Sequence, residues 1–456
     1  MASINNKALF SAATKAMDYV SEVDDRTVAP SESAVRNLDI FEEDLPETGK
    51  DEVQTIDLLD RIGSPATMAS TGGRYFGFVV GGTHPAALAA NWLSSAWDQN
   101  AGLTATSPVS AAIEKVCERW ITEILPVAKG SAVGFVTGVT MANFSALAAA
   151  RSAILAKLEW DVETRGLTGA PQIKVVVGAE AHASLFKALR LLGMGTDHII
   201  RVPGDENGCM RKDLLPVVNA NTIVCLQAGN VNTGGMDDGR LVLEAKKYGA
   251  WVHIDGAFGL WTSASSSHRH LTTGYEYADS WATDGHKWLN VPYDSGVVIC
   301  RRRDHLRKAM SVEGSYLDQS EERVPYKHTP ELSRRARAID IWATLRTLGK
   351  HGMDDLITRT CGFARQFAQH LSQAGFEILN EVTTNQVLVS FGSDSETLAV
   401  TRAIQADGTC WAGTTVWRGR VALRISVSSW KTTDNDVTKS IQAIIKCARM
   451  VSRKAA

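Results

Sequence analysis

The middle of the chain alternates short apolar runs with longer stretches of helical periodicity. Between residues 75 and 305, the runs are rich in β-branched residues and are bounded by glycine or polar residues. Runs of this kind are typical of strands that are buried on both faces of a sheet. Because helices separate them, the pattern predicts a layered α/β domain with a mostly parallel sheet. The predicted strands are Val133–Thr137, Lys174–Val177, Thr222–Gln227, Trp251–Ile254, Ser280–Thr283 and Gly296–Cys300, and the predicted helices are Asn143–Leu158, Ala183–Leu192 and Leu241–Tyr248.

The first 70 residues show a different pattern. Ala8–Val20 has apolar residues at helical spacing, and Pro30–Ser33 predicts a break followed by the N-cap of a second helix. This region is too short and too polar to hold a core of its own. We therefore expect residues 1–70 to form a helical arm that packs on the rest of the chain or on a second subunit.

The end of the chain predicts a smaller α+β domain. A polar stretch over residues 313–329 leads into a long predicted helix, Glu331–Leu348. The sequence therefore divides into the arm (1–70), a large domain (71–330) and a small domain (331–456). The later predicted strands are Gly375–Leu379, Gln386–Ser390 and Val421–Ser426, and a closing helix is predicted over Asp434–Met450.

Composition narrows the class of protein. Of the 456 residues 44% are apolar, and 48 Lys+Arg against 50 Asp+Glu give a net charge of −2. The chain is therefore expected to fold, and it has no surplus of cations with which to bind nucleic acid. Its seven cysteines show neither CxxC nor metal-ligand spacing, so we predict reduced thiols and no metal site. Without a signal-peptide pattern or a run of about 20 apolar residues, we expect a cytoplasmic location and no membrane partner.

A lysine and an aspartate end two consecutive predicted strands. Lys287 comes just after the strand predicted at 280–283, and Asp255 ends the strand predicted at 251–254. Taken singly, the lysine could reach the surface and the aspartate could cap a helix. Taken together, they supply an amine that forms an imine and a carboxylate that keeps a ring nitrogen protonated, which are the two groups that pyridoxal 5'-phosphate needs. The pair therefore predicts this cofactor.

Two further features fit the same cofactor. Residues 134–143 form a predicted strand, glycine turn and helix start, where backbone N–H groups and the Thr140 hydroxyl can bind phosphate. This turn matches neither a P-loop nor GxGxxG, which argues against nucleotide hydrolysis and nicotinamide chemistry. His182 follows the strand predicted at 174–177 and can lie over the cofactor ring, although a lone histidine in a loop is usually structural.

Together these segments resemble the group II pyridoxal-phosphate-dependent amino acid decarboxylases, relatives of the aromatic-L-amino-acid and glutamate decarboxylases. The similarity extends from about residue 70 to 350 and is most specific over Ala278–Ser280 and Asp284–Leu289, with Asp255 at the matching distance. The resemblance implies aminotransferase fold type I: a large domain with a mostly parallel sheet of the seven-stranded type, a small C-terminal α+β domain and an N-terminal helical arm. It also implies a homodimer with the active site at the subunit interface.

The resemblance further implies roles for individual residues. Lys287 is expected to form the internal aldimine, Asp255 to pair with the pyridine nitrogen, and His182 to stack on the ring. Tyr316, in the motif Ser-Tyr-Leu, matches a tyrosine on a mobile loop of the family that donates a proton after CO2 leaves; its alternative role is to anchor the loop. The polar run Asp318–Lys327 suits a lid over the substrate. The residues expected to hold the phosphate are Val139, Thr140 and His286.

Some positions depart from the family's pattern. Asp284 replaces a common asparagine, and this places a second anion near the phosphate that needs a partner. The turn Gly229–Gly234 and the sequence Asp-Gly-Ala-Phe from Asp255 also differ. Phe78 lies in a segment that shapes the substrate pocket in relatives, and its alternative is a core aromatic. These departures weaken any transfer of substrate identity.

The implied reaction is decarboxylation of an L-amino acid to its amine through an external aldimine and a quinonoid. The same residues suit an aldolase-like C–C lyase or an aldehyde-forming decarboxylase, but Tyr316 favours simple decarboxylation. A transaminase is less favoured, because the sequence does not place the arginine that would bind its substrate carboxylate; Arg424 is a candidate only. A catalytically silent scaffold is disfavoured by the complete set of Lys287, Asp255 and His182. The sequence does not identify the amino acid.

Overall fold

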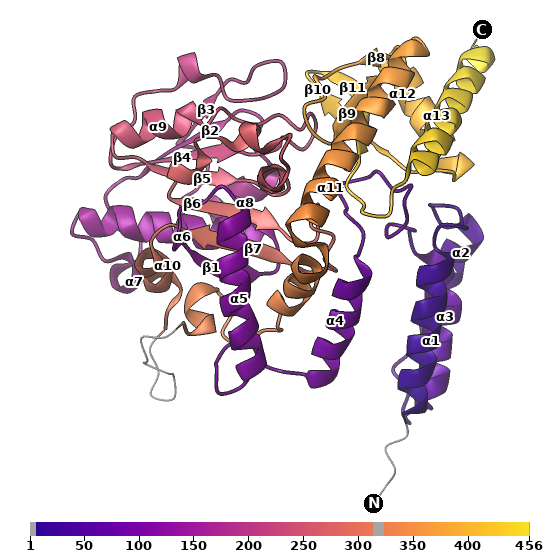
Figure 1. Ribbon diagram of the computed structural model, residues 1–456, viewed down its shortest axis with the longest axis horizontal. Coiled ribbons are helices and arrows are strands. Elements are labelled where there is room, and N and C mark those ends of the chain that lie inside the picture. The colour runs from indigo at the N-terminus through magenta and orange to yellow at the C-terminus, as the bar shows by residue number, and fades with distance from the viewer. Residues whose placement is uncertain (1–5, 313–322, 456) are drawn as a thin grey trace, which may run out of the picture.

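A computed structural model of the chain describes residues 6–312 and 323–455. Its centre is a seven-stranded sheet in the order β1-β7-β6-β5-β4-β2-β3 (Figure 1). The strands from β6 through β5, β4 and β2 to β3 are parallel, and β7 is antiparallel to both of its neighbours. The predicted α/β fold with a mostly parallel, seven-stranded sheet is confirmed. The strands are β1 (Ala132–Val136), β2 (Lys174–Gly178), β3 (Ile199–Val202), β4 (Thr222–Gln227), β5 (Trp251–Asp255), β6 (Ser280–Asp284) and β7 (Gly296–Cys300).

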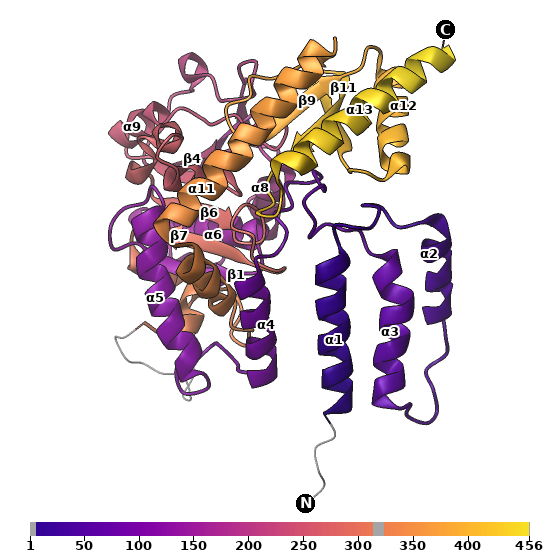
Figure 2. The same cartoon turned by 45° about the vertical axis from the view of Figure 1, so that its right-hand side comes forward.

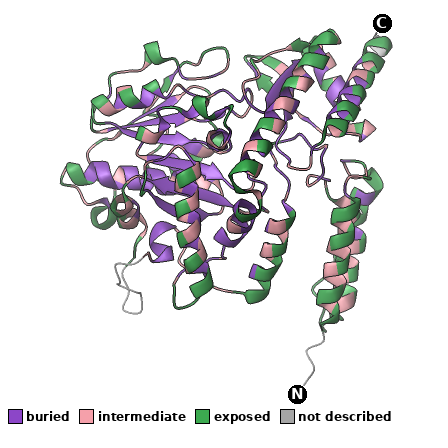
Figure 3. Cartoon of the chain, viewed as in Figure 1, coloured by how far each residue is buried: buried purple, intermediate pink, exposed green. Residues whose placement is uncertain are grey.

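Helices cover both faces of this sheet, and strands β1, β5, β6 and β7 are buried along their whole length (Figure 3). Alternate strand residues point into two apolar clusters: Val133 and Phe135 of β1 join one, and Ala132 and Val136 join the other. Burial on both faces explains the continuous apolar runs in the sequence. The helices of this part are α4 (Pro85–Trp97), α5 (Pro108–Ile124), α6 (Val139–Lys157), α7 (Val162–Arg165), α8 (Ala183–Leu191), α9 (Arg240–Lys247) and α10 (Arg303–Met310).

Helix α6 is both long and apolar. Within the described ranges, it is the helix whose length and composition would allow it to cross a membrane. It packs against β5, β6 and β7 and against α8 and α10, and 72% of its most apolar window is buried. These contacts make α6 a core helix of the large sheet.

A second sheet is formed by the end of the chain. It contains four antiparallel strands in the order β10-β11-β9-β8, with α11, α12 and α13 packed beside it (Figure 2). The helix predicted over Glu331–Leu348 begins later, at Ala338. The residues before it are not helical, because the buried Arg334 pairs with Glu114 and its carbonyl accepts from Ala101 N. The elements are α11 (Ala338–Gln373), β8 (Glu377–Ile378), β9 (Gln386–Ser390), α12 (Asp394–Asp407), β10 (Gly413–Trp417), β11 (Arg420–Ser426) and α13 (Asp434–Ala455).

The N-terminal residues form a helical arm, as predicted. Helices α1 (Lys7–Glu22), α2 (Glu32–Arg36) and α3 (Glu52–Ala66) lie side by side at one edge of the molecule (Figures 1 and 2). Ser31 caps α2, as the sequence predicted. No residue of α1 is buried. The arm therefore exposes apolar side chains, which include Leu9, Phe10, Met17 and Leu59.

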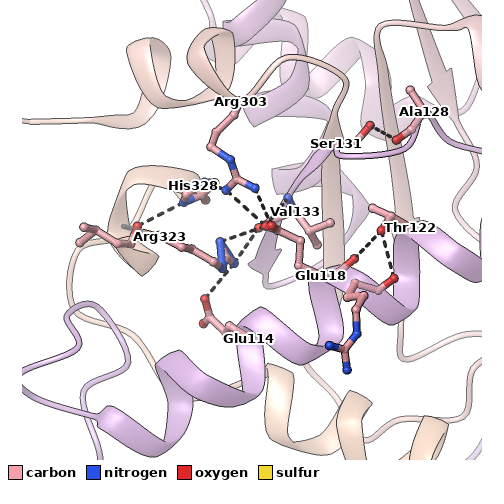
Figure 4. A network of polar contacts seen from close by, with 11 residues as sticks. Glu114, Glu118, Thr122, Ala128, Ser131, Val133, Arg303, Arg323 and His328 are labelled. Carbon is pink, nitrogen blue, oxygen red and sulfur yellow. Dashed lines mark hydrogen bonds and ion pairs between the residues drawn. The ribbon is translucent and has the colours of Figure 1, made fainter. Parts of the chain in front are cut away.

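A buried cluster of charges joins α5 to the residues that follow position 322 (Figure 4). Glu114 Oε2 lies 3.0 Å from an Arg323 nitrogen, and Glu114 Oε1 lies 2.7 Å from an Arg334 nitrogen. Arg323 also donates to the carbonyl of Val133 on β1, at 2.8 Å. Glu118 accepts from Arg323 and from Arg303 of α10. Three arginines and two glutamates thus connect α5, α10 and the start of β1.

Candidate active site

The residues predicted to bind the cofactor or to act in catalysis converge at the carboxyl ends of the parallel strands. Asp255 is the last residue of β5 and Asp284 the last of β6, and these strands are hydrogen-bonded neighbours. His286 and Lys287 follow β6, and His182 follows β2 on the same edge of the sheet. Ligands of open α/β sheets bind at this edge. The fold therefore brings the predicted residues to the place where a cofactor is expected.

Asp255 is a buried carboxylate. Its Oδ2 accepts a hydrogen bond of 3.0 Å from Nδ2 of Asn143, in the second turn of α6. Burial raises the pKa of Asp255, and the bond from Asn143 and the positive charges of His182 and Lys287 oppose that rise. A carboxylate held in this way can accept a hydrogen bond from a protonated ring nitrogen.

Lys287 lies within reach of the same space. Its Nζ is 3.1 Å from Oδ2 of Asp284, and its side chain is only 19% exposed. It therefore does not extend to the surface, which was the alternative role for this lysine. The carbonyl of Lys287 also lies so close to Gly81 that a side chain there would collide with it, at 1.7 Å.

Asp284 is paired, as its position beside a phosphate site requires. Besides Lys287, it contacts His286 Nε2 at 3.5 Å, and its Oδ1 accepts the backbone N–H of Val139 at 2.7 Å. The N–H of Val139, which we expect to bind the phosphate, thus donates to Asp284 in this structure. The other predicted phosphate ligands at this turn are Thr140, in the first turn of α6, and His286.

The imidazole of His286 lies against the start of α6. Its Nδ1 accepts from the backbone N–H of Ser295 at 3.1 Å, so the proton of the neutral ring is on Nε2. A Cβ on Gly138 would lie 3.1 Å from Cε1 of His286, so glycine permits this close approach. Burial lowers the pKa of His286, and the charge of Asp284 opposes this. A helix N-terminus with a neutral N–H donor beside it suits an anion.

His182 is the N-cap residue of α8. Its Nδ1 accepts from the backbone N–H of Ser184 at 3.2 Å, which leaves the proton of the neutral ring on Nε2. Part of the residue is open to solvent, yet burial of the ring lowers its pKa, and the charge of Asp255 opposes this. Helix capping and cofactor contact are compatible, because they use opposite sides of the ring.

Phe78 and Arg424 lie together on the small-sheet side. The Phe78 ring stacks on Trp411 at 5.7 Å, and the Arg424 guanidinium lies 6.0 Å from the Phe78 centroid. Phe78 is 62% exposed, so the alternative of a core aromatic is wrong. Arg424 donates to the carbonyl of Val231, in the turn after β4, and its charge lowers the pKa of His182. Arg424 therefore lies where a carboxylate of a bound molecule could reach it.

Two predictions fall on residues 313–322: Tyr316 and the first half of the polar run Asp318–Lys327 lie outside the described residues. Conversely, the sequence reasoning missed Asn143 and His253, which form one network with Asp255. A signal for His253 was present. It precedes Asp255 by two positions on one strand, so both side chains point to the same face of the sheet.

The residues present fit pyridoxal phosphate. The site offers an amine at Lys287, a buried carboxylate at Asp255 for a protonated ring nitrogen, and an anion site at the start of α6. His182 supplies an aromatic face near the two charged groups.

The comparisons with known proteins agree. The family model of the pyridoxal-dependent decarboxylase conserved domain matches residues 36–393. An aromatic-L-amino-acid decarboxylase of Bacillus atrophaeus is 25% identical over 441 residues, which cover 90% of this chain and 88% of that protein. An L-2,4-diaminobutyrate decarboxylase of Rhizobium meliloti is 28% identical over 80% of this chain and 75% of its own. The acidic amino acid decarboxylase GADL1 of Mus musculus is 26% identical over 68% of this chain, which spans 58% of the mouse protein.

Solved structures share the fold. TDC of Oryza sativa, solved with PLP and tryptamine, gives a TM-score of 0.88 at 21% identity and covers 99% of both chains. Mouse CSAD gives 0.87 at 19% identity and covers 97% of this chain and 98% of its own. The chain therefore belongs to the pyridoxal-dependent decarboxylase family and is a lyase that uses pyridoxal 5'-phosphate to decarboxylate an amino acid.

Proposed function

We propose that this enzyme converts an L-amino acid to its amine, with Lys287, Asp255 and His182 as the residues that contact cofactor or substrate. The observation that supports this most strongly is the convergence of these residues at the ends of β5, β6 and β2. When bound, pyridoxal phosphate supplies an electron sink for the pair that the departing carboxyl group leaves behind.

Each residue then has a defined task. Lys287 Nζ, which lies 3.1 Å from Asp284, would hold the cofactor aldehyde. Asp255 would keep the ring nitrogen protonated. His182, whose proton is on Nε2, can deliver a proton to the substrate carbon, a task that we also assign to Tyr316. Arg424 is the residue that we propose to bind a carboxylate of the substrate. This carboxylate is either a second acidic group, which Arg424 would then select for, or the α-carboxylate, which it would hold in place.

The test is a spectroscopic and product assay. Purified protein incubated with pyridoxal phosphate should absorb at the edge of the visible range, and Lys287→Ala should lose that band. A panel of the twenty amino acids is then scored for CO2, amine, aldehyde and hydrogen peroxide. Amine with CO2 and no aldehyde supports the proposal. Aldehyde with CO2 and peroxide would instead show the aldehyde-forming reaction, and aldehyde without CO2 would show C–C cleavage of the aldolase type.

We also propose that the enzyme is a homodimer with the active site at the subunit interface. The arm and α4 enclose an apolar groove of about 690 Å³, lined by Tyr19, Leu59, Leu88 and Trp92 among others. The helices that line this groove also expose apolar side chains, with Phe10 of α1 76% exposed and Leu93 of α4 55% exposed. Exposed apolar surface on this scale is typical of a contact between subunits. The occupant that we propose is the same face of a second copy.

A further inference from the structure

A chain of buried polar side chains ends on Asp255. The indole Nε1 of Trp251 donates to Ser280 Oγ at 2.9 Å, and Ser280 Oγ lies 3.0 Å from Nδ1 of His253. Nε2 of His253 lies 3.0 Å from Oδ1 of Asn143, whose Nδ2 donates to Oδ2 of Asp255 at 3.0 Å. All five residues are buried, and Asn143, His253 and Ser280 are 0% exposed.

The two ends of this chain fix the direction of every hydrogen bond in it. An ionised carboxylate accepts only, so Asn143 must present its NH2 group to Asp255 and its oxygen to His253. His253 must therefore carry its proton on Nε2, because two acceptors would otherwise face each other. Its bare Nδ1 then accepts from the Ser280 hydroxyl, whose oxygen accepts from the indole of Trp251, which can only donate. Every donor points toward Asp255.

A neutral His253 is consistent with its surroundings. Burial lowers the pKa of His253 to about 3, so the ring carries one proton at neutral pH. Hydrogen bonds that point in one direction polarise one another in a buried site. The amide of Asn143 is thus a stronger donor to Asp255 than an isolated amide would be. The chain also occupies Oδ2 and holds the carboxylate in one orientation.

We propose that Asn143, His253, Ser280 and Trp251 are positioning residues that keep Asp255 ionised and aimed at the cofactor's ring nitrogen. This inference rests on the proposed function, because it takes Asp255 as the partner of that nitrogen. Without this chain of hydrogen bonds, a carboxylate at a buried strand end would itself bind a proton. It would then no longer stabilise the positive charge on the ring nitrogen. The chain therefore acts on cofactor binding through the ring nitrogen, and not through the phosphate or Lys287.

The test compares the binding of two cofactors to three variants of the protein. Asn143→Ala removes the bond to Asp255, and His253→Phe removes the donor to Asn143 while it keeps a ring of similar size. His253→Gln is the conservative variant, since its amide can donate where Nε2 does. The probes are pyridoxal phosphate and 1-deazapyridoxal phosphate, in which a C–H group replaces the ring nitrogen. Affinity for each is measured by titration of the cofactor-free protein, with absorbance as the readout.

We expect Asn143→Ala to bind pyridoxal phosphate about 10- to 100-fold more weakly than the wild type, because a bond to a charged group is lost. His253→Phe should lose about threefold to tenfold, and His253→Gln should stay within about twofold. Affinity for the deaza cofactor should change in none of them. The matched control is His268→Phe, a buried histidine that bonds Ser265 away from the site; it should lower thermal stability without changing either affinity.

Two outcomes would overturn the inference. Equal losses for both cofactors would show that the chain merely supports the fold, and unchanged affinity for pyridoxal phosphate in Asn143→Ala would show that Asp255 does not need it. Failure of the proposed function gives a different result, since the wild type would then form no absorbing complex with pyridoxal phosphate.

Discussion

At the scale of single residues, the site depends on two buried carboxylates that end adjacent strands and have different partners. Asp255 accepts a hydrogen bond from the neutral side-chain amide of Asn143. Asp284 instead lies beside Lys287 and His286 and accepts a hydrogen bond from the N–H of Val139. Asp255 is thus available to pair with the protonated ring nitrogen of the cofactor. Asp284 instead pairs with Lys287 of the protein itself, next to the place where a phosphate is expected.

This difference predicts the effect of Asp284→Asn. The amide oxygen can still accept from Val139, but the negative charge beside the phosphate site is gone. We expect affinity for pyridoxal phosphate to rise on the order of tenfold, since like charges at a few ångströms repel by about 1–4 kcal/mol. Titration of the cofactor-free protein measures it. Asp279→Asn, which breaks a half-buried pair with Lys246 at the other end of β6, is the control and should leave this affinity unchanged. Weaker binding by Asp284→Asn would contradict the prediction.

His253 also predicts how stability depends on pH. An unfolded histidine binds a proton near pH 6.5, whereas folded His253 does so only at about pH 3. In this window the unfolded state binds more protons, so the contribution of His253 is complete above pH 6.5 and is lost as the pH falls. Between pH 5.5 and 4.5 the wild type should lose about 1.4 kcal/mol more unfolding free energy than His253→Gln. Urea unfolding at both values checks this, and parallel losses would refute it.

At the scale of elements, the sequence predicted best the strands that lie in the middle of the large sheet. The runs at β4 and β7 match their predicted bounds, because burial on both faces makes most residues of these strands apolar. The missed strands are β3, which is partly exposed at the edge of the sheet, and β10, whose burial alternates. Their mixed composition gives no continuous apolar signal.

The start of α11 was wrong for a reason that local sequence does not contain. Residues from 331 have helical periodicity, but Arg334 forms an ion pair with Glu114, which lies more than 200 positions away along the chain. The same limit applies in the active site. Lys287 and Asp255 were found from their places at strand ends, while Asn143 was missed because its partner Asp255 lies on a strand 112 positions later.

The cluster around Glu114 predicts a large effect from one substitution. Glu114→Gln leaves Arg323 and Arg334 buried with one carboxylate fewer, and we expect the free energy of unfolding to fall by about 3–5 kcal/mol. Urea unfolding measures the change. The control on the same helix is Glu123→Gln, whose partner Lys350 is 71% exposed, and it should cause no measurable loss. Similar losses in both variants would show that burial of the pair is unimportant.

At the scale of the whole molecule, the arm is the part whose exposed apolar side chains are least covered by contacts within one chain. Its helices contact one another, yet α1 buries no residue and the groove beside α4 stays open. A second copy over this face would bury the apolar residues that the arm exposes. The molecule is then two catalytic bodies joined through their N-terminal helices.

This arrangement predicts that Phe10→Asp with Leu59→Asp weakens the dimer. The wild type should sediment at twice the chain mass of 49.3 kDa, and the double variant should shift toward one chain mass at micromolar concentration. Val416→Asp on β10, where the side chain is 64% exposed, is the control and should not change the sedimenting mass. A wild type that sediments at one chain mass would refute the proposed assembly.

The apolar helix α6 has a consequence for the synthesis of the chain. Two of its main partners, β7 and α10, end at Cys300 and Met310, about 150 positions after α6 itself ends at Lys157. At roughly 5–20 residues per second, a ribosome needs on the order of 10–30 s to make them. Throughout that interval α6, a segment apolar enough for a membrane, lacks these two partners. Holding chaperones should therefore bind the nascent chain most strongly after residue 157 emerges, and release it once residue 310 has emerged.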